Sequence, residues 1–137
     1  MVFYNHRRIT DPRVMIVGFF PYPETSHLNE HTMRYHFRGL AVTYGCNVQV
    51  VHNVGSIMRL PDLPIICMEE PHAGTVDLMD FEHPRDAIYM VGNSRFENLS
   101  QWFEADHLVS IRAPMSGQPL YGDQVAAIVM NDRTYKL

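Results

Sequence analysis

The sequence predicts an α/β fold in which helices pack against a parallel β-sheet. Short apolar segments of strand length alternate with polar or helical segments along all 137 residues. The first of them, residues 14–20, is an uninterrupted apolar run closed by prolines, which is typical of a strand buried on both faces. No internal repeat and no apolar run of the ~20 residues that a membrane span needs interrupts this pattern. We therefore expect one domain, residues 1–137.

The expected elements follow one another in a regular order. Apolar runs bounded by turn residues predict strands at 13–20, 47–52, 63–68, 86–91 and 107–112. Apolar spacing of three or four residues predicts a long helix that begins at a Ser26 cap and ends at Gly45. Shorter helical turns are expected at 55–59, at 76–81 and after Asn98 or Ser100, and a last helix at about 123–133.

The last helix carries a further signal. Its segment 125–130 (VAAIVM) is apolar all round, which predicts burial on several sides. The paired alanines would let another backbone approach closely. In so small a domain, a subunit interface is a natural place for such a helix.

Composition restricts the function. A net charge of −4 argues against a protein that holds nucleic acid by bulk electrostatics. Residues 1–38, however, hold five arginines against three acidic side chains, so this end could meet a polyanion or form a solvated surface. The absence of a signal-peptide pattern and the presence of only two cysteines, Cys46 and Cys67, predict reduced thiols in a cytoplasmic or virion-associated protein.

Two C-terminal segments carry a family resemblance. Residues 87–100 read as a strand, a Gly-Asn turn and a polar loop that enters a helix. Residues 108–129 read as a strand, Pro-Met, Gly, a loop with Leu and an Ala-rich helix. Together they resemble motifs two and three of the SpoU/TrmH family of tRNA and rRNA ribose 2′-O-methyltransferases. Residues 80–84 look like the lead-in to motif two, and residues 13–45 look more loosely like motif one.

The resemblance implies a SPOUT-like fold with a C-terminal trefoil knot, with the knot and cofactor region at about 86–137. It also implies a homodimer formed through the last helix and S-adenosylmethionine bound among the knot loops. RNA, first of all tRNA, is the implied substrate, and neither a metal nor a membrane is expected. By position, the residues that would hold the cofactor, mainly through backbone and apolar groups, are Val91, Gly92, Asn93, Ile111, Pro114, Met115 and Leu120.

The motif-one arginine of the family organises phosphate and hydroxyl groups, and Arg38 is our candidate for it. Arg34, one helical turn away, is a candidate RNA phosphate contact. Both could equally be ordinary surface arginines.

The sequence departs from the family at polar positions. Ser94 stands where the family has Glu, Tyr121 where it has Asn, and Asp123 where it has Ser. Two hypotheses therefore stay open. The chain is either an S-adenosylmethionine-dependent RNA 2′-O-methyltransferase or a non-catalytic knotted protein that binds RNA or cofactor.

A zinc site is a weaker alternative. His27, Glu30 and His31 match H-x-x-E-H, and Glu69 or Glu70 could be imagined as a third ligand. The pattern fixes only three residues, and the peptidases that use it are far larger than this chain.

Overall fold

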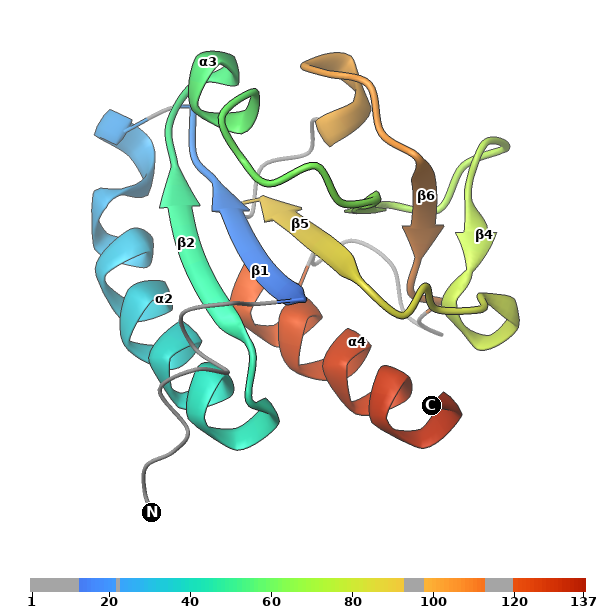
Figure 1. Ribbon diagram of the computed structural model, residues 1–137. Coiled ribbons are helices and arrows are strands. Elements are labelled where there is room, and N and C mark those ends of the chain that lie inside the picture. Colours follow the sequence, from blue (N-terminus) through green and yellow to red (C-terminus); the bar gives the residue numbers. More distant parts are fainter. Residues whose placement is uncertain (1–12, 22, 93–97, 113–119) are drawn as a thin grey trace.

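The computed structural model describes residues 13–21, 23–92, 98–112 and 120–137, with the backbone alone for 23–30. Six strands form one sheet in the order β2-β1-β5-β3-β6-β4 (Figure 1), and every neighbouring pair is parallel. The strands are β1 Val14–Phe19, β2 Asn47–Val51, β3 Ile65–Glu69, β4 Val76–Asp77, β5 Ala87–Gly92 and β6 His107–Ser110. The predicted parallel α/β architecture is confirmed. The threading of the predicted knot depends on residues 93–97 and 113–119, which lie outside the described residues.

The two long helices pack on one face of the sheet and two of the short ones on the other (Figure 1). On the first face lie α2 (Pro23–Tyr44) and α4 (Gly122–Lys136); on the second lie α3 (Val54–Ile57) and the 3₁₀ helix η2 (Leu99–Gln101). A second 3₁₀ helix, η1 (Leu78–Asp80), follows β4. Because the central strands are covered on both faces, their side chains are apolar at successive positions rather than at alternate ones.

Helix α2 ends as predicted. Gly45 follows it with φ 67°, and the backbone N–H of Gly45 donates to the carbonyl of Ala41 (2.9 Å). Its start differs, because α2 begins at Pro23 rather than at a Ser26 cap. Proline suits the first helical turn, where its fixed φ is already helical and no N–H is needed.

The segment at residues 76–81 contains the predicted helical turn, which is η1, and a short strand before it that was not predicted. Val76 and Asp77 pair with Val109 and Ser110 of β6 as the edge strand β4. The Asp77 carboxylate then accepts a hydrogen bond from the Met79 backbone (2.9 Å) and caps η1. Strand β4 is only two residues long, which is too short to show an alternation of apolar and polar residues in the sequence.

A buried polar network attaches the C-terminal half of α4 to the segment before β5. The Tyr89 hydroxyl accepts from the Arg133 guanidinium (2.9 Å) and donates to Nδ1 of His83 (2.8 Å). Nε2 of His83 donates to the Asp132 carboxylate (2.7 Å). Burial lowers the pKa of His83, and both of its contacts suit one neutral tautomer. The network fixes the direction in which α4 leaves the sheet.

No helix in the described part of the chain has the length and apolar character needed to cross a membrane.

Candidate functional site

The candidate site lies where the parallel strands end. Strands β1, β3, β5 and β6 are parallel neighbours and finish at the same edge of the sheet, and ligands of open parallel sheets bind beyond that edge. β3 lies between β5 and β6, the two strands that lead into the predicted cofactor loops. The order of the strands therefore brings the ends of β5 and β6 to either side of Glu69, the last residue of β3.

Two glycines meet at this edge. A Cβ on Gly122, the first residue of α4, would collide with the carbonyl oxygen of Gly92 and lie 3.1 Å from Sδ of Met33. Gly92 ends β5, and a Cβ there would lie 3.4 Å from Cδ2 of Leu99. Glycine at position 122 thus allows the start of α4 to pack directly on the end of β5. The segments that resemble motifs two and three are brought into contact by their glycines.

The predicted cofactor residues occupy different environments. Gly92 and Ile111 are half-buried, and Leu120 is exposed just before α4. The side chain of Val91 is buried in the core between the sheet and α2. The other three predicted residues lie outside the described residues: Asn93, Pro114 and Met115.

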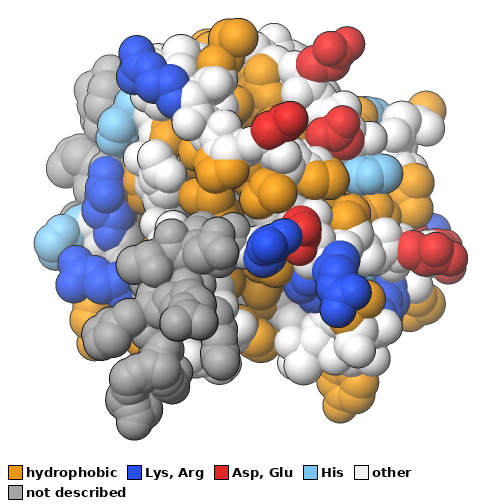
Figure 2. Space-filling model, in the orientation of Figure 1, with side chains coloured by type: hydrophobic (Ala, Val, Ile, Leu, Met, Phe, Trp, Pro, Cys, Tyr) orange, Lys and Arg blue, Asp and Glu red, His pale blue; other side chains and the backbone are white. Residues whose placement is uncertain are grey.

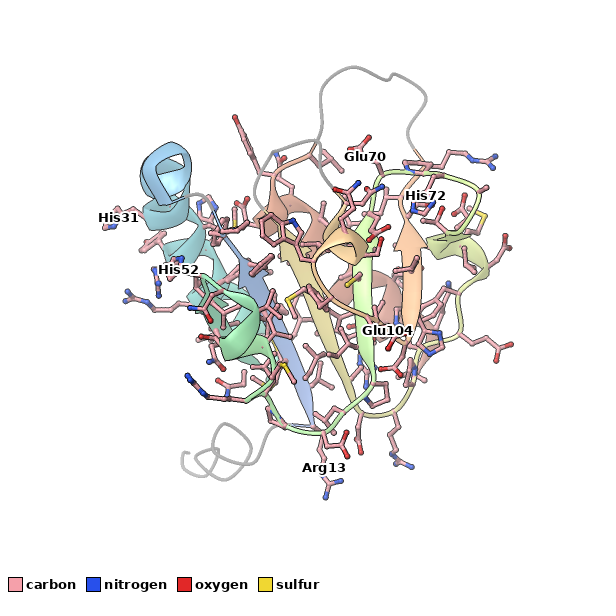
Figure 3. All side chains as sticks on the ribbon, turned by 90° about the horizontal axis from the view of Figure 1, so that it is seen from above. Arg13, His31, His52, Glu70, His72 and Glu104 are labelled. Atoms are coloured by element: carbon pink, nitrogen blue, oxygen red, sulfur yellow. The ribbon has the colours of Figure 1, made fainter. Side chains whose placement is uncertain are left out.

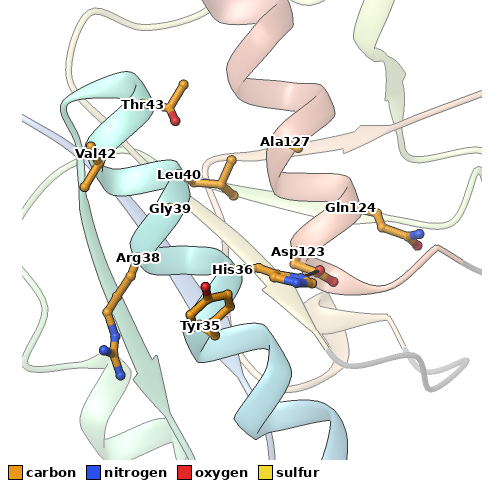
Figure 4. A pocket seen from close by; sticks show the side chains of 10 residues that line it. All are labelled: Tyr35, His36, Arg38, Gly39, Leu40, Val42, Thr43, Asp123, Gln124 and Ala127. Atoms are coloured by element: carbon orange, nitrogen blue, oxygen red, sulfur yellow. Dashed lines mark hydrogen bonds and ion pairs between the residues drawn. The ribbon is translucent and has the colours of Figure 1, made fainter.

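A groove of about 630 Å³ separates α2 from α4 (Figure 4). His36 of α2 pairs across it with the carboxylate of Asp123 in the first turn of α4. Arg38 also lines the groove, whereas Arg34 lies one turn nearer the carboxyl edge on the exposed surface of α2. The lining residues are Tyr35, His36, Arg38, Gly39, Leu40, Val42, Thr43, Asp123, Gln124 and Ala127. Figure 4 shows the Arg38 side chain extending away from α4, on the other side of α2 from Asp123. The candidate catalytic arginine therefore borders the groove but lies apart from the helix turn that starts at Gly122.

The part of α2 from residue 31 on carries arginines and histidines without acidic side chains between them. From residue 31 to residue 44 the sequence has two arginines, two histidines and no acidic side chain. Figure 2 shows this colouring along the edge of the molecule over α2, while acidic side chains lie mainly elsewhere on the same face. Although the net charge of the protein is negative, this surface of α2 would not repel a polyanion.

Sequence reasoning overlooked the role of Glu69. Its side chain is wholly enclosed, and its two oxygens contact the backbone N–H of Ser100 (2.6 Å) and Nε2 of His72 (2.7 Å). In the sequence, Glu69 stands out only as an imagined third zinc ligand. The signal that could have identified it is an acidic residue directly after a run of buried apolar residues, since a buried carboxylate needs partners.

The zinc alternative gains no support. Figure 3 shows His31 at one edge of the molecule and Glu70 far from it, near the middle of the view. Among the residues that the structure describes, no three His, Cys, Asp or Glu side chains are grouped closely enough to hold a metal ion.

Comparison with solved structures identifies the fold. The chain superposes on the SpoU methyltransferase AviRb from Streptomyces viridochromogenes in complex with the cofactor AdoMet, with a TM-score of 0.62 and 15% sequence identity. The chain has the SpoU methyltransferase fold. The match covers 90% of this chain and 59% of AviRb, so the chain spans less than two thirds of that protein.

Two further structures agree. A second AviRb structure matches with a TM-score of 0.59 and 16% identity over 91% of this chain and 60% of AviRb. A probable methylase family protein from Haemophilus influenzae Rd KW20 matches with a TM-score of 0.53 and 11% identity, over 91% of this chain and 66% of that one. No model of a protein family matches the sequence, and neither does any curated protein.

Proposed function

We propose that this chain is an S-adenosylmethionine-dependent methyltransferase of the SpoU family that methylates ribose 2′-hydroxyls of RNA. The observation that carries the proposal is the contact of Gly92 with Gly122 at the carboxyl edge, within a fold shared with a SpoU methyltransferase. We expect the protein to act in the cytoplasm, where its two buried free thiols would stay reduced.

The residues at this edge fit the cofactor. Gly92 presents no side chain at this edge, and the half-buried Ile111 and the exposed Leu120 offer apolar surface. Backbone and apolar groups of this kind would hold the adenine. The bound cofactor would supply an electrophilic methyl group. The task of the protein would be to place the acceptor hydroxyl in line with that methyl, and positioning supplies most of the rate in such transfers.

Arg38 is the residue we propose to act on the acceptor. A guanidinium can bind a phosphate through two hydrogen bonds and lower the cost of deprotonating a nearby hydroxyl. Its place in the lining of the groove between α2 and α4 supports this role. Arg34 would contact a further phosphate of the same RNA. tRNA is the first substrate to test.

We also propose that two copies associate through α4. Its outward face carries an uncharged stripe at helical spacing: Tyr121, Gln124, Ile128, Asn131 and Tyr135. Across the groove, Tyr35 and Val42 of α2 are 73% and 84% exposed. An uncharged surface with large apolar side chains is typical of an interface between subunits. Ile128→Glu should convert a dimer into a monomer in sedimentation equilibrium, and Met58→Glu, at an exposed apolar residue directly after α3, should not.

Calorimetric titration with S-adenosylmethionine and S-adenosylhomocysteine tests the cofactor proposal. We expect micromolar binding at one site per subunit. Transfer of a labelled methyl group to tRNA or rRNA, followed by mapping of the modified ribose, would then test the reaction. A folded protein that binds neither ligand would refute the proposal.

One observation favours a non-catalytic alternative. Asp123, at a position where the family has Ser, is engaged in the ion pair with His36 that joins the two helices. Its carboxylate is thus used for structure rather than left for a substrate. Cofactor binding without methyl transfer to any RNA would support a binding protein that has lost its active site.

A further inference from the structure

A buried carboxylate connects two segments at the carboxyl edge. Glu69 ends β3, and its side chain has 0% exposure. An ionised carboxylate at such a place is costly unless both oxygens have hydrogen-bond donors. Here Oε2 accepts from the backbone N–H of Ser100 (2.6 Å), and Oε1 accepts from Nε2 of His72 (2.7 Å). Short hydrogen bonds to a charged group are among the stronger ones in proteins.

The bond to Ser100 replaces a missing helix cap. Ser100 lies in the first turn of η2, where backbone N–H groups have no acceptor within the helix. The residue that should cap this turn, Asn98, makes no side-chain capping bond. Glu69 supplies the acceptor from a different strand. The position of η2 therefore depends on a carboxylate that is fixed in the centre of the sheet.

Helix η2 in turn forms the wall beside Gly92. Leu99, the residue before Ser100, is 6% exposed, and its Cδ2 lies 3.4 Å from the place where a Cβ of Gly92 would stand. A shift of η2 moves Leu99 and changes the space next to Gly92. Contacts thus run without a break from Glu69 through Ser100 and Leu99 to Gly92.

The other partner of Glu69 is itself held in one orientation. Nδ1 of His72 accepts from the N–H of Gly74 (3.1 Å), so Nε2 carries the proton and donates to Glu69. The Thr75 hydroxyl accepts from the His72 N–H (3.2 Å) and donates to its carbonyl (2.9 Å). This turn lies at the carboxyl edge, where Figure 3 labels His72 and Glu70. His72 therefore satisfies the second oxygen of Glu69.

We infer that Glu69 is a positioning residue of the cofactor site. Its carboxylate fixes η2, and through η2 it sets the wall that Leu99 forms beside Gly92. The identity of the ligand rests on the proposed function, whereas the anchoring of η2 does not.

Glu69→Gln tests the inference, with Glu70→Gln as its control. Glutamine keeps one carbonyl acceptor and replaces the other oxygen with a donor, so it cannot accept from both Ser100 and His72. Glu70 is the next residue and is exposed, so the same change there tests for an effect of charge alone. Two quantities are measured: hydrogen exchange at the Ser100 amide by NMR, and calorimetric affinity for S-adenosylhomocysteine.

We expect only Glu69→Gln to speed exchange at Ser100, by at least roughly tenfold, and to weaken binding by roughly ten- to a hundredfold. Exchange and affinity equal to those of Glu70→Gln would overturn the inference. Faster exchange with unchanged affinity would overturn it too, because Glu69 would then be a cap without influence on the site. If the wild-type protein binds no ligand, the proposed function fails, and the exchange comparison still decides whether Glu69 anchors η2.

A second pair of variants serves if Glu69→Gln does not fold. His72→Leu removes the donor to Glu69, and His72→Gln restores one. We expect the leucine variant to bind S-adenosylhomocysteine more weakly and the glutamine variant to recover much of the affinity. Equal affinities in both would contradict the role of the Glu69 carboxylate.

Discussion

Gly122 packs against the carbonyl oxygen of Gly92, and a side chain at position 122 would collide with it. The contact joins the end of a central strand to the start of the last helix. Residues 87–100 and 108–129, the two segments with the family resemblance, therefore cannot separate at this point unless α4 moves. The shape of the candidate site is therefore tied to the packing of α4 on the sheet.

Gly122→Ala should destabilise the protein. The added methyl group forces α4 away from β5, and overpacking of this kind costs about 1–3 kcal/mol. Urea unfolding measures the change. Gly39→Ala is the control, because a Cβ at Gly39 meets nothing within 4 Å and alanine is the better helix former. A Gly122→Ala protein as stable as the wild type would contradict the close contact.

Gly92→Val should abolish cofactor binding and leave the fold intact. The first carbon of the new side chain lies 3.4 Å from Leu99, an ordinary contact, so the core can accept it. The branched methyl groups beyond it would fill space that we assign to the cofactor. Calorimetry and circular dichroism measure the two effects, and Gly92→Ala should lie between valine and wild type. Unchanged affinity in the valine variant would remove Gly92 from the site.

Arg38→Ala should eliminate methyl transfer and spare cofactor affinity. The arginine lines the groove and is assigned to the RNA rather than to the cofactor. A labelled-methyl assay and calorimetry, run side by side, separate the two steps. Arg59→Ala, an exposed arginine next to α3, should behave as the wild type. Full activity without Arg38 would refute its proposed role.

Acid should weaken the fold through His83. Because burial lowers its pKa, the folded protein binds this proton less readily than the unfolded chain, whose histidines titrate near about 6.5. The contribution of His83 to the free energy of unfolding is therefore fully present above that pH and is lost as the pH falls below it. The free energy of unfolding should drop more between pH 7.5 and 5.5 in the wild type than in His83→Gln. The control His31→Gln should keep the pH dependence of the wild type. The same pH dependence of the free energy of unfolding in all three proteins would contradict the role of His83.

The two cysteines should resist alkylation in the native protein. Both are free and buried, and burial raises the pKa of Cys46 to about 11 and also raises that of Cys67. Since the thiolate is the reactive form, little of it is present at neutral pH. Iodoacetamide labelling followed by mass spectrometry should be far slower in buffer than in urea. Equal rates in both would show that the thiols are accessible.

Local signals were enough to predict most elements but not their arrangement. The apolar run of β1 and the Gly45 signal at the end of α2 are properties of consecutive residues, and both predictions are confirmed. Strand β4 was missed because it consists of two residues held only by β6. The order of the strands was beyond reach, since buried parallel strands have similar sequences whatever their neighbours.

The two glycines that meet at the carboxyl edge stand in segments that the sequence singles out, whereas the polar contacts there do not. Gly92 stood out as a turn after an apolar strand. Glu69 finds its donors at Ser100, 31 residues away in sequence, and at His72 in a turn. His36 and Asp123 likewise come from two helices that are far apart in the sequence. Such pairs are set by the tertiary fold, and no spacing in the sequence indicates them.

The central place of β5 affects how the protein is made. β5 lies between β1 and β3, yet it is synthesised after both. Until then β1 has only β2 as a neighbour, and β3 has none, because its other partner β6 comes later still. At about 5–20 residues per second, the ribosome needs several seconds to supply the missing strand. During that interval the nascent chain exposes unpaired apolar edges, and we expect any fragment that stops before residue 87 to aggregate rather than fold.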